Sequence, residues 1–263
     1  MSELTDIAST GPSAAFFDLD RTLISGSSTF VLAIAAWRNG LIDRGQFSRD
    51  AVDALKFRLT GASDETSHGV RDRILAAVKG VRRDDLVGLN ADTVPTLLEK
   101  VRPEALALVE RHRQAGRATY IVSAAPVELV DPLARAMGMT AGIGTVSEIV
   151  DGTYTGRLVG PFCYGEGKVE AITELARWEG LALDQCYAYS DSASDLPMLD
   201  AVGHPVAVNP DAKLERHAYR NGWPIVIFSR RTKAVVRRTS EALGATALAA
   251  GSFAVGVRWA RSR

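Results

Sequence analysis

The stretch AAFFDLDRTL at residues 14–23 places two carboxylates directly after a short apolar run. Residues 14–17 are all apolar, which is typical of a buried strand. Side chains alternate along a strand, so Asp18 and Asp20 should leave the same side of the chain. Burying two acids costs free energy unless a cation or a substrate pairs with them. The stretch therefore indicates a site for a divalent cation such as Mg²⁺ and for phosphoryl chemistry.

The composition of the 263-residue chain is that of an ordinary globular protein, with 46% hydrophobic and 24% charged residues. This length suits one large domain, or one domain with an insert. The formal net charge is zero, so we expect no nucleic-acid partner. Two isolated cysteines, Cys163 and Cys186, predict a reducing, cytoplasmic location, and the four histidines lack the paired spacing of a zinc site.

Further short apolar runs alternate with helical patterns along the chain. The predicted strands cover residues 14–17, 118–122, 186–189, 206–208 and 225–228. The predicted helices, each with apolar residues at helical spacing, cover residues 103–114, 127–137 and 168–178. This alternation predicts an α/β fold in which a parallel sheet is covered by helices on both faces.

Residues 25–101 interrupt this alternation, and we expect them to form a helical cap over the site. Within them, helices are predicted at residues 29–39, 47–59 and 67–78. A smaller interruption follows at residues 147–160, where Asp151 and Gly152 separate two short polar-apolar runs. An Asp-Gly pair in this setting predicts a β-hairpin.

The tail at residues 230–263 carries eight Lys or Arg residues and a single acid, Glu241. Its residues 242–257 are uncharged, but a membrane span takes about 20 apolar residues, so this stretch is marginal. Basic residues on both flanks favour membrane contact. A helix packed on the domain and a frayed tail are the alternatives. Residues 1–13 lack an apolar core, and we expect no secretory signal there.

Four polar features follow one another along the chain. They are the Asp18–Asp20 pair, Ser123 after an apolar run, Lys168 at the start of a helix, and the Asp191–Asp195 pair after another run. Each has an ordinary structural explanation on its own, because such residues cap helices, begin turns or lie on the surface. Open α/β sheets bind ligands at the carboxyl ends of their strands, where three of the four features fall.

In this order and spacing, the features resemble the haloacid dehalogenase superfamily, within its phosphoserine-phosphatase-like subfamily IB. The resemblance spans residues 14–228. It implies a Rossmann-like catalytic core from residues 1–24 and 102–229, with residues 25–101 as the cap and residues 230–263 as a separate tail.

The resemblance also implies catalytic roles for four residues. Asp18 would attack phosphorus to form an aspartyl-phosphate, and Asp20 would protonate the leaving alkoxide and then activate water. Ser123 and Lys168 would bind the phosphoryl oxygens. The lysine has a further physical justification, because an anionic nucleophile that approaches a phosphate is repelled unless positive charge lies nearby.

The same resemblance implies a Mg²⁺ cofactor with oxygen ligands. Asp18, the backbone carbonyl of Asp20, and Asp191 would hold the ion, and Asp195 would orient this metal cluster.

Three positions depart from the subfamily pattern. Ser27 stands where phosphoserine phosphatases carry a glutamate that contacts the substrate amino group, which argues against phosphoserine as the substrate. Residues 190–195 read SDSASD in place of the usual glycines and asparagine, and residues 124–126 lack the usual glycine pair. Arg21, beside the catalytic acids, is expected to form a surface salt bridge, and contact with the substrate is the alternative.

The sequence therefore favours a Mg²⁺-dependent phosphomonoester phosphatase that acts on a small phosphorylated metabolite. A phosphotransferase or mutase with the same intermediate is an alternative, as is a membrane-associated regulatory protein with low turnover. P-loop hydrolysis is excluded because Val169 follows Lys168 where Ser or Thr is required. A serine hydrolase is excluded because Ser123 lies outside a G-x-S-x-G motif.

Overall fold

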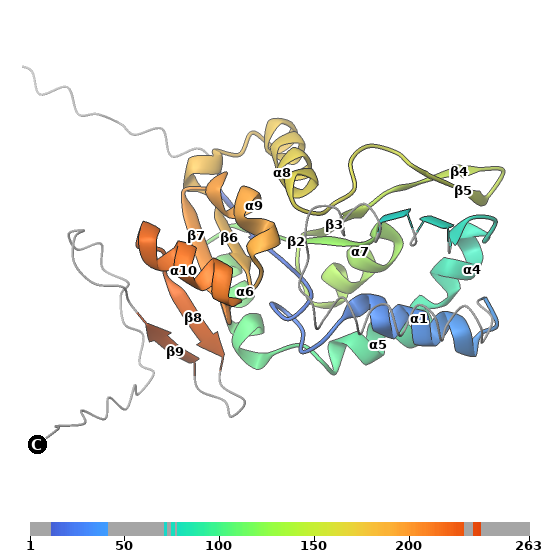
Figure 1. Cartoon of the computed structure of the whole chain (residues 1–263), viewed down its shortest axis with the longest axis horizontal. Coiled ribbons are helices and arrows are strands. Elements are labelled where there is room, and N and C mark those ends of the chain that lie inside the picture. Colours follow the sequence, from blue (N-terminus) through green and yellow to red (C-terminus); the bar gives the residue numbers. More distant parts are fainter. Residues whose placement is uncertain (1–11, 42–70, 73–74, 77, 229–233, 238–263) are drawn as a thin grey trace, which may run out of the picture.

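The fold is built around a mostly parallel sheet, seen in a computed structural model that describes residues 12–41, 71–72, 75–76, 78–228 and 234–237 (Figure 1). Within the described residues, the sheet has seven strands in the order β3-β2-β1-β6-β7-β8-β9, and only β9 runs antiparallel to its neighbour. The strands are β1 (Ala14–Phe17), β2 (Ala118–Pro126), β3 (Ala141–Thr145), β6 (Tyr187–Ser190), β7 (His204–Val208), β8 (Ile225–Phe228) and β9 (Ala234–Arg237). The predicted α/β class is confirmed.

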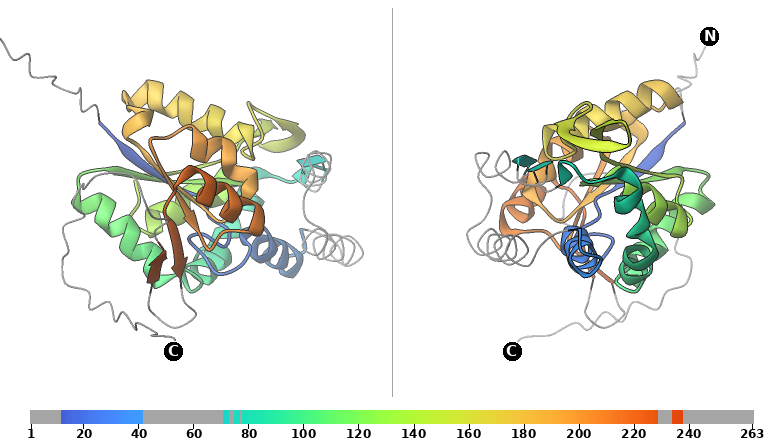
Figure 2. Two further views of the ribbon diagram at one scale, coloured as in Figure 1. Left: turned by 60° about the vertical axis from the view of Figure 1, so that its left-hand side comes forward. Right: turned by 90° about the vertical axis from the view of Figure 1, so that its right-hand side faces the viewer.

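Helices cover both faces of this sheet (Figure 2). On one face, α6 (Pro103–Gln114) and α7 (Val127–Ala136) share a core with Ala15 and Phe17 of β1. On the other face, α8 (Glu166–Glu179), α9 (Leu196–Asp200) and α10 (Ala212–Asn221) share a core with Ala14 and Phe16. Alternate residues of β1 thus enter opposite cores, which explains why the whole strand is apolar.

Strand β1 lies inside the sheet, between β2 and β6. Its last residue, Phe17, is in register with Ile121 of β2 and with Tyr189 of β6. The two phenylalanines of β1 are almost fully buried, and each contributes about 1.5–3 kcal/mol through burial. The ends of three neighbouring strands therefore meet where the first pair of acids begins.

Strand β3 was not predicted, because its sequence AGIGT lacks a continuous apolar run. Gly142 lies against the backbone of α7 itself, and Gly144 lies against the backbone of the chain that leads into α7. A Cβ on Gly144 would stand 2.7 Å from the carbonyl oxygen of Ala125, and one on Gly142 would collide with the backbone of Val130. Close backbone approach therefore fixes glycine here, at the expense of the apolar pattern that identifies strands.

Three described helices belong to the residues expected to form the cap: α1 (Ser28–Arg38), α4 (Arg83–Gly88) and α5 (Asn90–Leu98). Helix α1 begins after Ser27, whose hydroxyl accepts a hydrogen bond from the backbone N–H of Phe30. The amide of Ser25 donates to the carbonyl of Lys100, and that of Arg102 donates to the carbonyl of Leu23. The insert therefore leaves and rejoins the core at one place, just beyond β1.

The predicted hairpin is confirmed as β4 (Ser147–Val150) and β5 (Thr153–Leu158), which pair antiparallel. Both turn residues, Asp151 and Gly152, have positive φ, as a tight two-residue hairpin turn requires. The amide of Tyr154 donates to the carbonyl of Val81, and the carbonyl of Tyr154 accepts from the amide of Gly80. These bonds tie the hairpin to the chain that enters α4.

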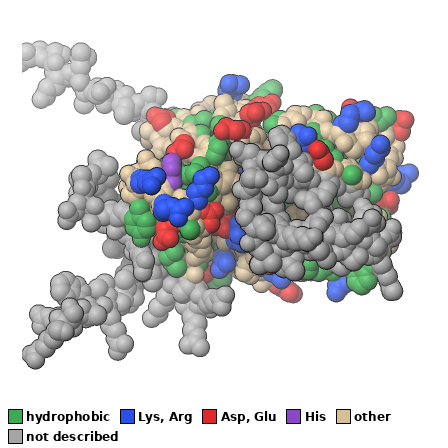
Figure 3. Space-filling view, in the orientation of Figure 1, with side chains coloured by type: hydrophobic (Ala, Val, Ile, Leu, Met, Phe, Trp, Pro, Cys, Tyr) green, Lys and Arg blue, Asp and Glu red, His purple; other side chains and the backbone are tan. Residues whose placement is uncertain are grey.

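Of the other predicted elements, one is confirmed and the rest lie wholly or mostly outside the described residues. The predicted helix at 29–39 is confirmed as α1, whereas the one at 47–59, most of the one at 67–78 and the apolar stretch 242–257 lie outside the described residues. Within the part of the chain that the structure describes, no helix has the length and apolarity needed to cross a membrane. On the face shown in Figure 3, basic and acidic side chains are intermingled over the described surface, in line with the zero net charge.

Candidate active site

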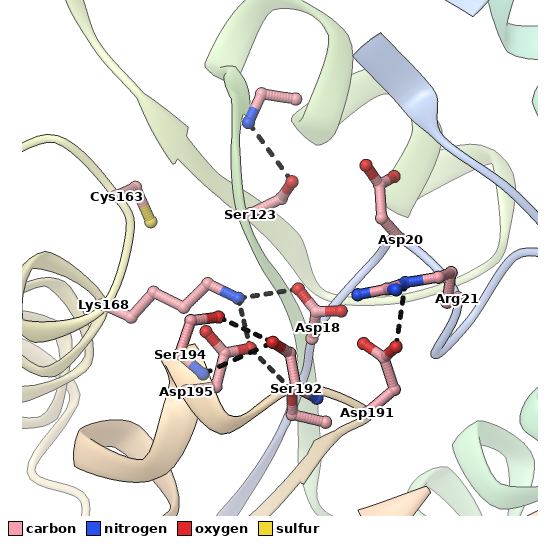
Figure 4. Close-up of polar contacts among 12 residues, drawn as sticks. Asp18, Asp20, Arg21, Ser123, Cys163, Lys168, Asp191, Ser192, Ser194 and Asp195 are labelled. Carbon is pink, nitrogen blue, oxygen red and sulfur yellow. Dashed lines mark hydrogen bonds and ion pairs between the residues drawn. The ribbon is translucent and has the colours of Figure 1, made fainter. Parts of the chain in front are cut away.

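The polar residues of the site gather at the carboxyl ends of β1, β2 and β6 (Figure 4). Asp18 directly follows β1, and its amide donates to the carbonyl of Tyr189, which fixes its backbone to β6. Ser123 lies within β2, and Asp191 directly follows β6. Lys168 comes from the first turn of α8. All four side chains are buried, so the charges of the two aspartates and the lysine interact in a poorly solvated space.

Lys168 is the central cation of the site. Its Nζ lies 2.7 Å from Oδ1 of Asp18 and 2.7 Å from Oδ2 of Asp195, and the residue is only 2% exposed. Burial disfavours the charged ammonium, but Asp18 and Asp195 outweigh it and raise the pKa of Lys168. Lys168 therefore stays protonated and holds both carboxylates.

A glycine makes this placement of Lys168 possible. The preceding residue, Gly167, packs so closely that a Cβ there would collide with the carbonyl oxygen of Phe162. The start of α8 can therefore rest directly on the preceding loop, which lets the lysine reach inward.

The surroundings of Asp18 act on its pKa in opposite directions. Burial raises its pKa to about 6, with nearby Asp195 and Asp20 acting in the same direction, while Lys168 lowers it. The ammonium therefore keeps this carboxyl largely ionised near neutral pH. An ionised carboxylate beside a fixed cation can act as a nucleophile toward an anionic substrate.

Asp20 lies in a different environment. Strand β1 ends at Phe17, so the alternation of side chains expected along a continued strand does not apply, and the Asp20 carboxylate is directed away from Asp18 (Figure 4). Its Oδ1 accepts a 2.8 Å hydrogen bond from the amide of Ser28 at the start of α1. Burial raises the pKa of Asp20, and the hydrogen bond from Ser28 opposes that rise. A raised pKa makes a carboxyl group better suited to donate a proton.

Ser123 and Ser190 have separate tasks. The Ser123 hydroxyl accepts a 3.2 Å hydrogen bond from the amide of Ala125, which leaves its own proton to be donated. Ser190, which was not predicted, donates to Oδ2 of Asp195 at 2.7 Å. The only signal for it in the sequence is its position at the end of a predicted strand.

Asp191 is paired with Arg21. The Nε of Arg21 lies 2.9 Å from Oδ2 of Asp191, and Figure 4 shows the guanidinium reaching toward Asp18. Burial, followed by repulsion from Asp18, raises the pKa of Asp191 to about 8, and Arg21 opposes that rise. The expected surface salt bridge of Arg21 is therefore an ion pair to a buried acid of the site.

The acids of the site suit a hard divalent cation in their chemistry. Asp18 and Asp191 are buried oxygen donors that disfavour each other's charge, and a cation between them would relieve that repulsion. Among the described residues, no group of three acids, histidines or cysteines already converges as a metal cage. Asp195 already accepts hydrogen bonds from Lys168 and Ser190, which makes it a poorer metal ligand than Asp18 and Asp191.

The predicted site residues therefore fall into three groups. Asp18, Lys168 and Asp195 are in direct contact, and Asp191 is joined to this group through charge and Arg21. Ser123 and Asp20 flank Asp18 without a direct hydrogen bond to Lys168 or Asp195 (Figure 4). The arrangement places a carboxylate that can act as a nucleophile, a carboxyl that can donate a proton and a fixed cation at the carboxyl ends of the central strands.

Known proteins are similar to this chain in sequence and in architecture. The sequence model described as haloacid dehalogenase-like hydrolase matches residues 15–200. A probable phosphatase of Mycobacterium tuberculosis is 40% identical, with 91% of this chain and 86% of that protein covered. Phosphoserine phosphatase SerB1 of the same species is 39% identical, with 92% and 80% covered.

Two further relatives extend this comparison. A histidinol-phosphatase of Neisseria meningitidis is 31% identical, with 81% of this chain and 98% of that protein covered. A crystal structure of a Bordetella pertussis protein of unknown function superposes with a TM-score of 0.72 and 30% identity, covering 82% of this chain and 98% of that one.

Proposed function

The chain belongs to the haloacid dehalogenase-like hydrolase family and is an enzyme, and from that premise we propose a Mg²⁺-dependent phosphomonoester phosphatase with an aspartyl-phosphate intermediate. The observation that carries the proposal is the buried contact of 2.7 Å between Lys168 Nζ and Asp18 Oδ1. It keeps a carboxylate charged inside the protein, next to positive charge that a phosphate would require.

In the first step, a carboxylate oxygen of Asp18 attacks phosphorus and the bond from phosphorus to the substrate oxygen breaks. Lys168 offsets the negative charge that accumulates between nucleophile and phosphate. The Ser123 hydroxyl donates its free proton to a phosphoryl oxygen, since its own oxygen already accepts from Ala125. Asp18 then carries the phosphoryl group.

Asp20 acts first as the general acid and then as the general base. Its raised pKa lets it donate a proton to the leaving alkoxide, which departs as an alcohol. The resulting carboxylate then accepts a proton from water as that water attacks phosphorus. The bond from phosphorus to Asp18 breaks, inorganic phosphate leaves, and both carboxyl groups return to their initial states. The direction of Asp20 toward the start of α1 supports a leaving group on the side of residues 25–101, which we propose as the cap.

The cation site of the proposal uses Asp18, the backbone carbonyl of Asp20, and Asp191. When bound there, Mg²⁺ supplies positive charge to the phosphoryl oxygens. Asp195 has a different part, because it holds Lys168 at 2.7 Å and is itself held by Ser190. We assign Asp195 to positioning the lysine.

We propose a small phosphorylated metabolite as the substrate. Relatives are named for phosphoserine and for histidinol phosphate, and both of these compounds are phosphomonoesters that carry an amino group. Ser27 brings no negative charge toward such an amino group, and its hydroxyl is already engaged in capping α1. We therefore treat phosphoserine as one candidate substrate among several phosphomonoesters.

The test is a phosphate-release assay with the full chain, Mg²⁺ and a panel of phosphoserine, histidinol phosphate, sugar phosphates and lipid phosphates. Release without any added acceptor distinguishes hydrolysis from phosphoryl transfer. Asp18→Asn should abolish release, and Asp184→Asn, which alters an exposed carboxylate before β6, should leave it unchanged. Undiminished release by Asp18→Asn would refute the proposed mechanism.

A further inference from the structure

Arg21 has a backbone conformation that arginine rarely adopts. Its φ of 65° lies in the left-handed region, where a Cβ is disfavoured. The turn around it is held in place, because the amides of Leu23 and Ile24 both donate to the carbonyl of Leu19. Strain of this kind persists where the surrounding structure over-determines it, and it is common at functional sites.

The strained turn delivers a cation to one acid of the site. The Nε of Arg21 lies 2.9 Å from Oδ2 of Asp191, whose side chain is 6% exposed, whereas the side chain of Arg21 is 53% exposed. A charge-assisted contact at this distance occupies a carboxylate oxygen that could otherwise bind a metal. The guanidinium also reaches toward Asp18, into the space between the two acids (Figure 4).

The two cations of the site differ in how freely they can leave it. Lys168 is almost completely buried and is held by Asp18 and Asp195, so its departure would strand a charge in the protein interior. Arg21 has a side chain that is half in solvent, so its guanidinium can move into water at little cost of desolvation. Only Arg21 is suited to exchange.

We propose that Arg21 is an internal counter-ion that a divalent metal must displace from Asp191, so that this arginine sets how tightly the site holds Mg²⁺. The inference rests on the metal site of the proposed function. Two cations close to the same carboxylate repel each other, and the ion pair therefore stabilises the metal-free state relative to the metal-bound state. Removing the guanidinium should strengthen metal binding.

The test measures Mg²⁺ binding directly, by isothermal titration calorimetry of the full chain with Mg²⁺ alone. Arg21→Asn and Arg21→Gly both remove the charge, and both residues tolerate the left-handed backbone, so the turn is preserved. Titrations at pH 8.5 reduce competition from protons. We expect each variant to lower the Kd for Mg²⁺ by about 1.5- to fivefold, which corresponds to losing one partly exposed competing ion pair.

A matched control is Arg135→Ala. Arg135 is also a partly exposed arginine, and its Nε donates to Asp131 at 2.8 Å on helix α7. Its removal should leave the Kd for Mg²⁺ unchanged. An equal fall in Kd for this control would show a general effect of surface charge and would overturn the inference.

Asp191→Asn separates this inference from the function on which it rests. If Mg²⁺ binding depends on Asp191 but both Arg21 variants bind with an unchanged or higher Kd, the counter-ion role is wrong and the proposed metal site stands. If the native chain binds no Mg²⁺, both the metal site and the role of Arg21 fail.

Discussion

Replacing Lys168 by methionine tests the electrostatic centre of the site. The change keeps an unbranched side chain as far as Cε but removes the ammonium of a residue that is 2% exposed and contacts two carboxylates at 2.7 Å. Removing one partner of a buried ion pair typically costs about 3–5 kcal/mol, because a charge remains without compensation. We expect a loss near the lower end, about 3 kcal/mol at pH 8, because Asp18, whose pKa is raised by burial, can take up a proton.

Proton uptake gives this prediction a definite pH dependence. Without Lys168, the folded protein binds a proton on the buried Asp18 more readily than the unfolded chain does, because burial raises the pKa of Asp18 and the lysine no longer opposes it. This contribution to the stability of the variant rises as pH falls, so its deficit relative to the native chain should shrink between pH 8 and pH 5. Chemical denaturation with urea at both pH values measures this difference.

Activity supplies the second measurement on the Lys168 variant. A fixed cation beside developing charge is worth about 10²–10³ in kcat, and we expect a loss of that size. Lys213→Met, on the exposed side of α10, is the control and should change neither stability nor turnover. If Lys168→Met is as stable as the native chain at pH 8 and keeps turnover within threefold, the assigned role of the lysine is wrong.

Three further predictions concern stability, packing and proton transfer. Burial, with help from Arg117, lowers the pKa of His112 from 6.5 to about 4, so its neutral form contributes stability that is full above pH 6.5 and lost as pH falls to 4. The difference corresponds to at most about 3 kcal/mol, and denaturation of His112→Gln across this range should lack that part of the slope. Gly167→Ala should destabilise the fold by about 2 kcal/mol or more and reduce activity, since its Cβ collides with Phe162, whereas Gly88→Ala has open space and should be nearly neutral in the same urea titration. Asp20→Asn should slow the first step, release of the alcohol, far more for alkyl phosphates than for p-nitrophenyl phosphate, whose leaving group needs no proton. Equal slowing of that step in single-turnover measurements would rule out Asp20 as the proton donor.

The sequence was most informative where one local rule decides the structure. Strand β1 and helix α6 match their predicted ranges, because a fully apolar run and a proline-led amphipathic helix have few alternatives. The hairpin was equally clear from Asp151 and Gly152, whose positive φ values are those the turn demands.

The features that could not be predicted from the sequence depend on contacts between segments that are distant along the chain. The glycines that allow β3 to approach α7 and the chain leading into it interrupt the apolar pattern of the strand, because they are required by a neighbouring segment and not by the strand itself. The partner of Arg21 is 170 positions away along the chain, so no local pattern could distinguish an ordinary surface pair from a contact inside the site. The same holds for Asp195, whose contact with Lys168 exists only once α8 packs against the chain that joins β6 to α9.

The central claim is that Asp18 becomes phosphorylated during turnover. Borohydride added to the enzyme during turnover of a good substrate with Mg²⁺ reduces an acyl phosphate to an alcohol, which would convert Asp18 to homoserine. Tryptic digestion releases residues 1–21 as one peptide, and fragmentation by mass spectrometry locates the change within it. We predict homoserine at position 18, and none in enzyme treated without substrate. An unmodified Asp18 in enzyme that releases phosphate, or reduction at another residue instead, would contradict the proposed intermediate.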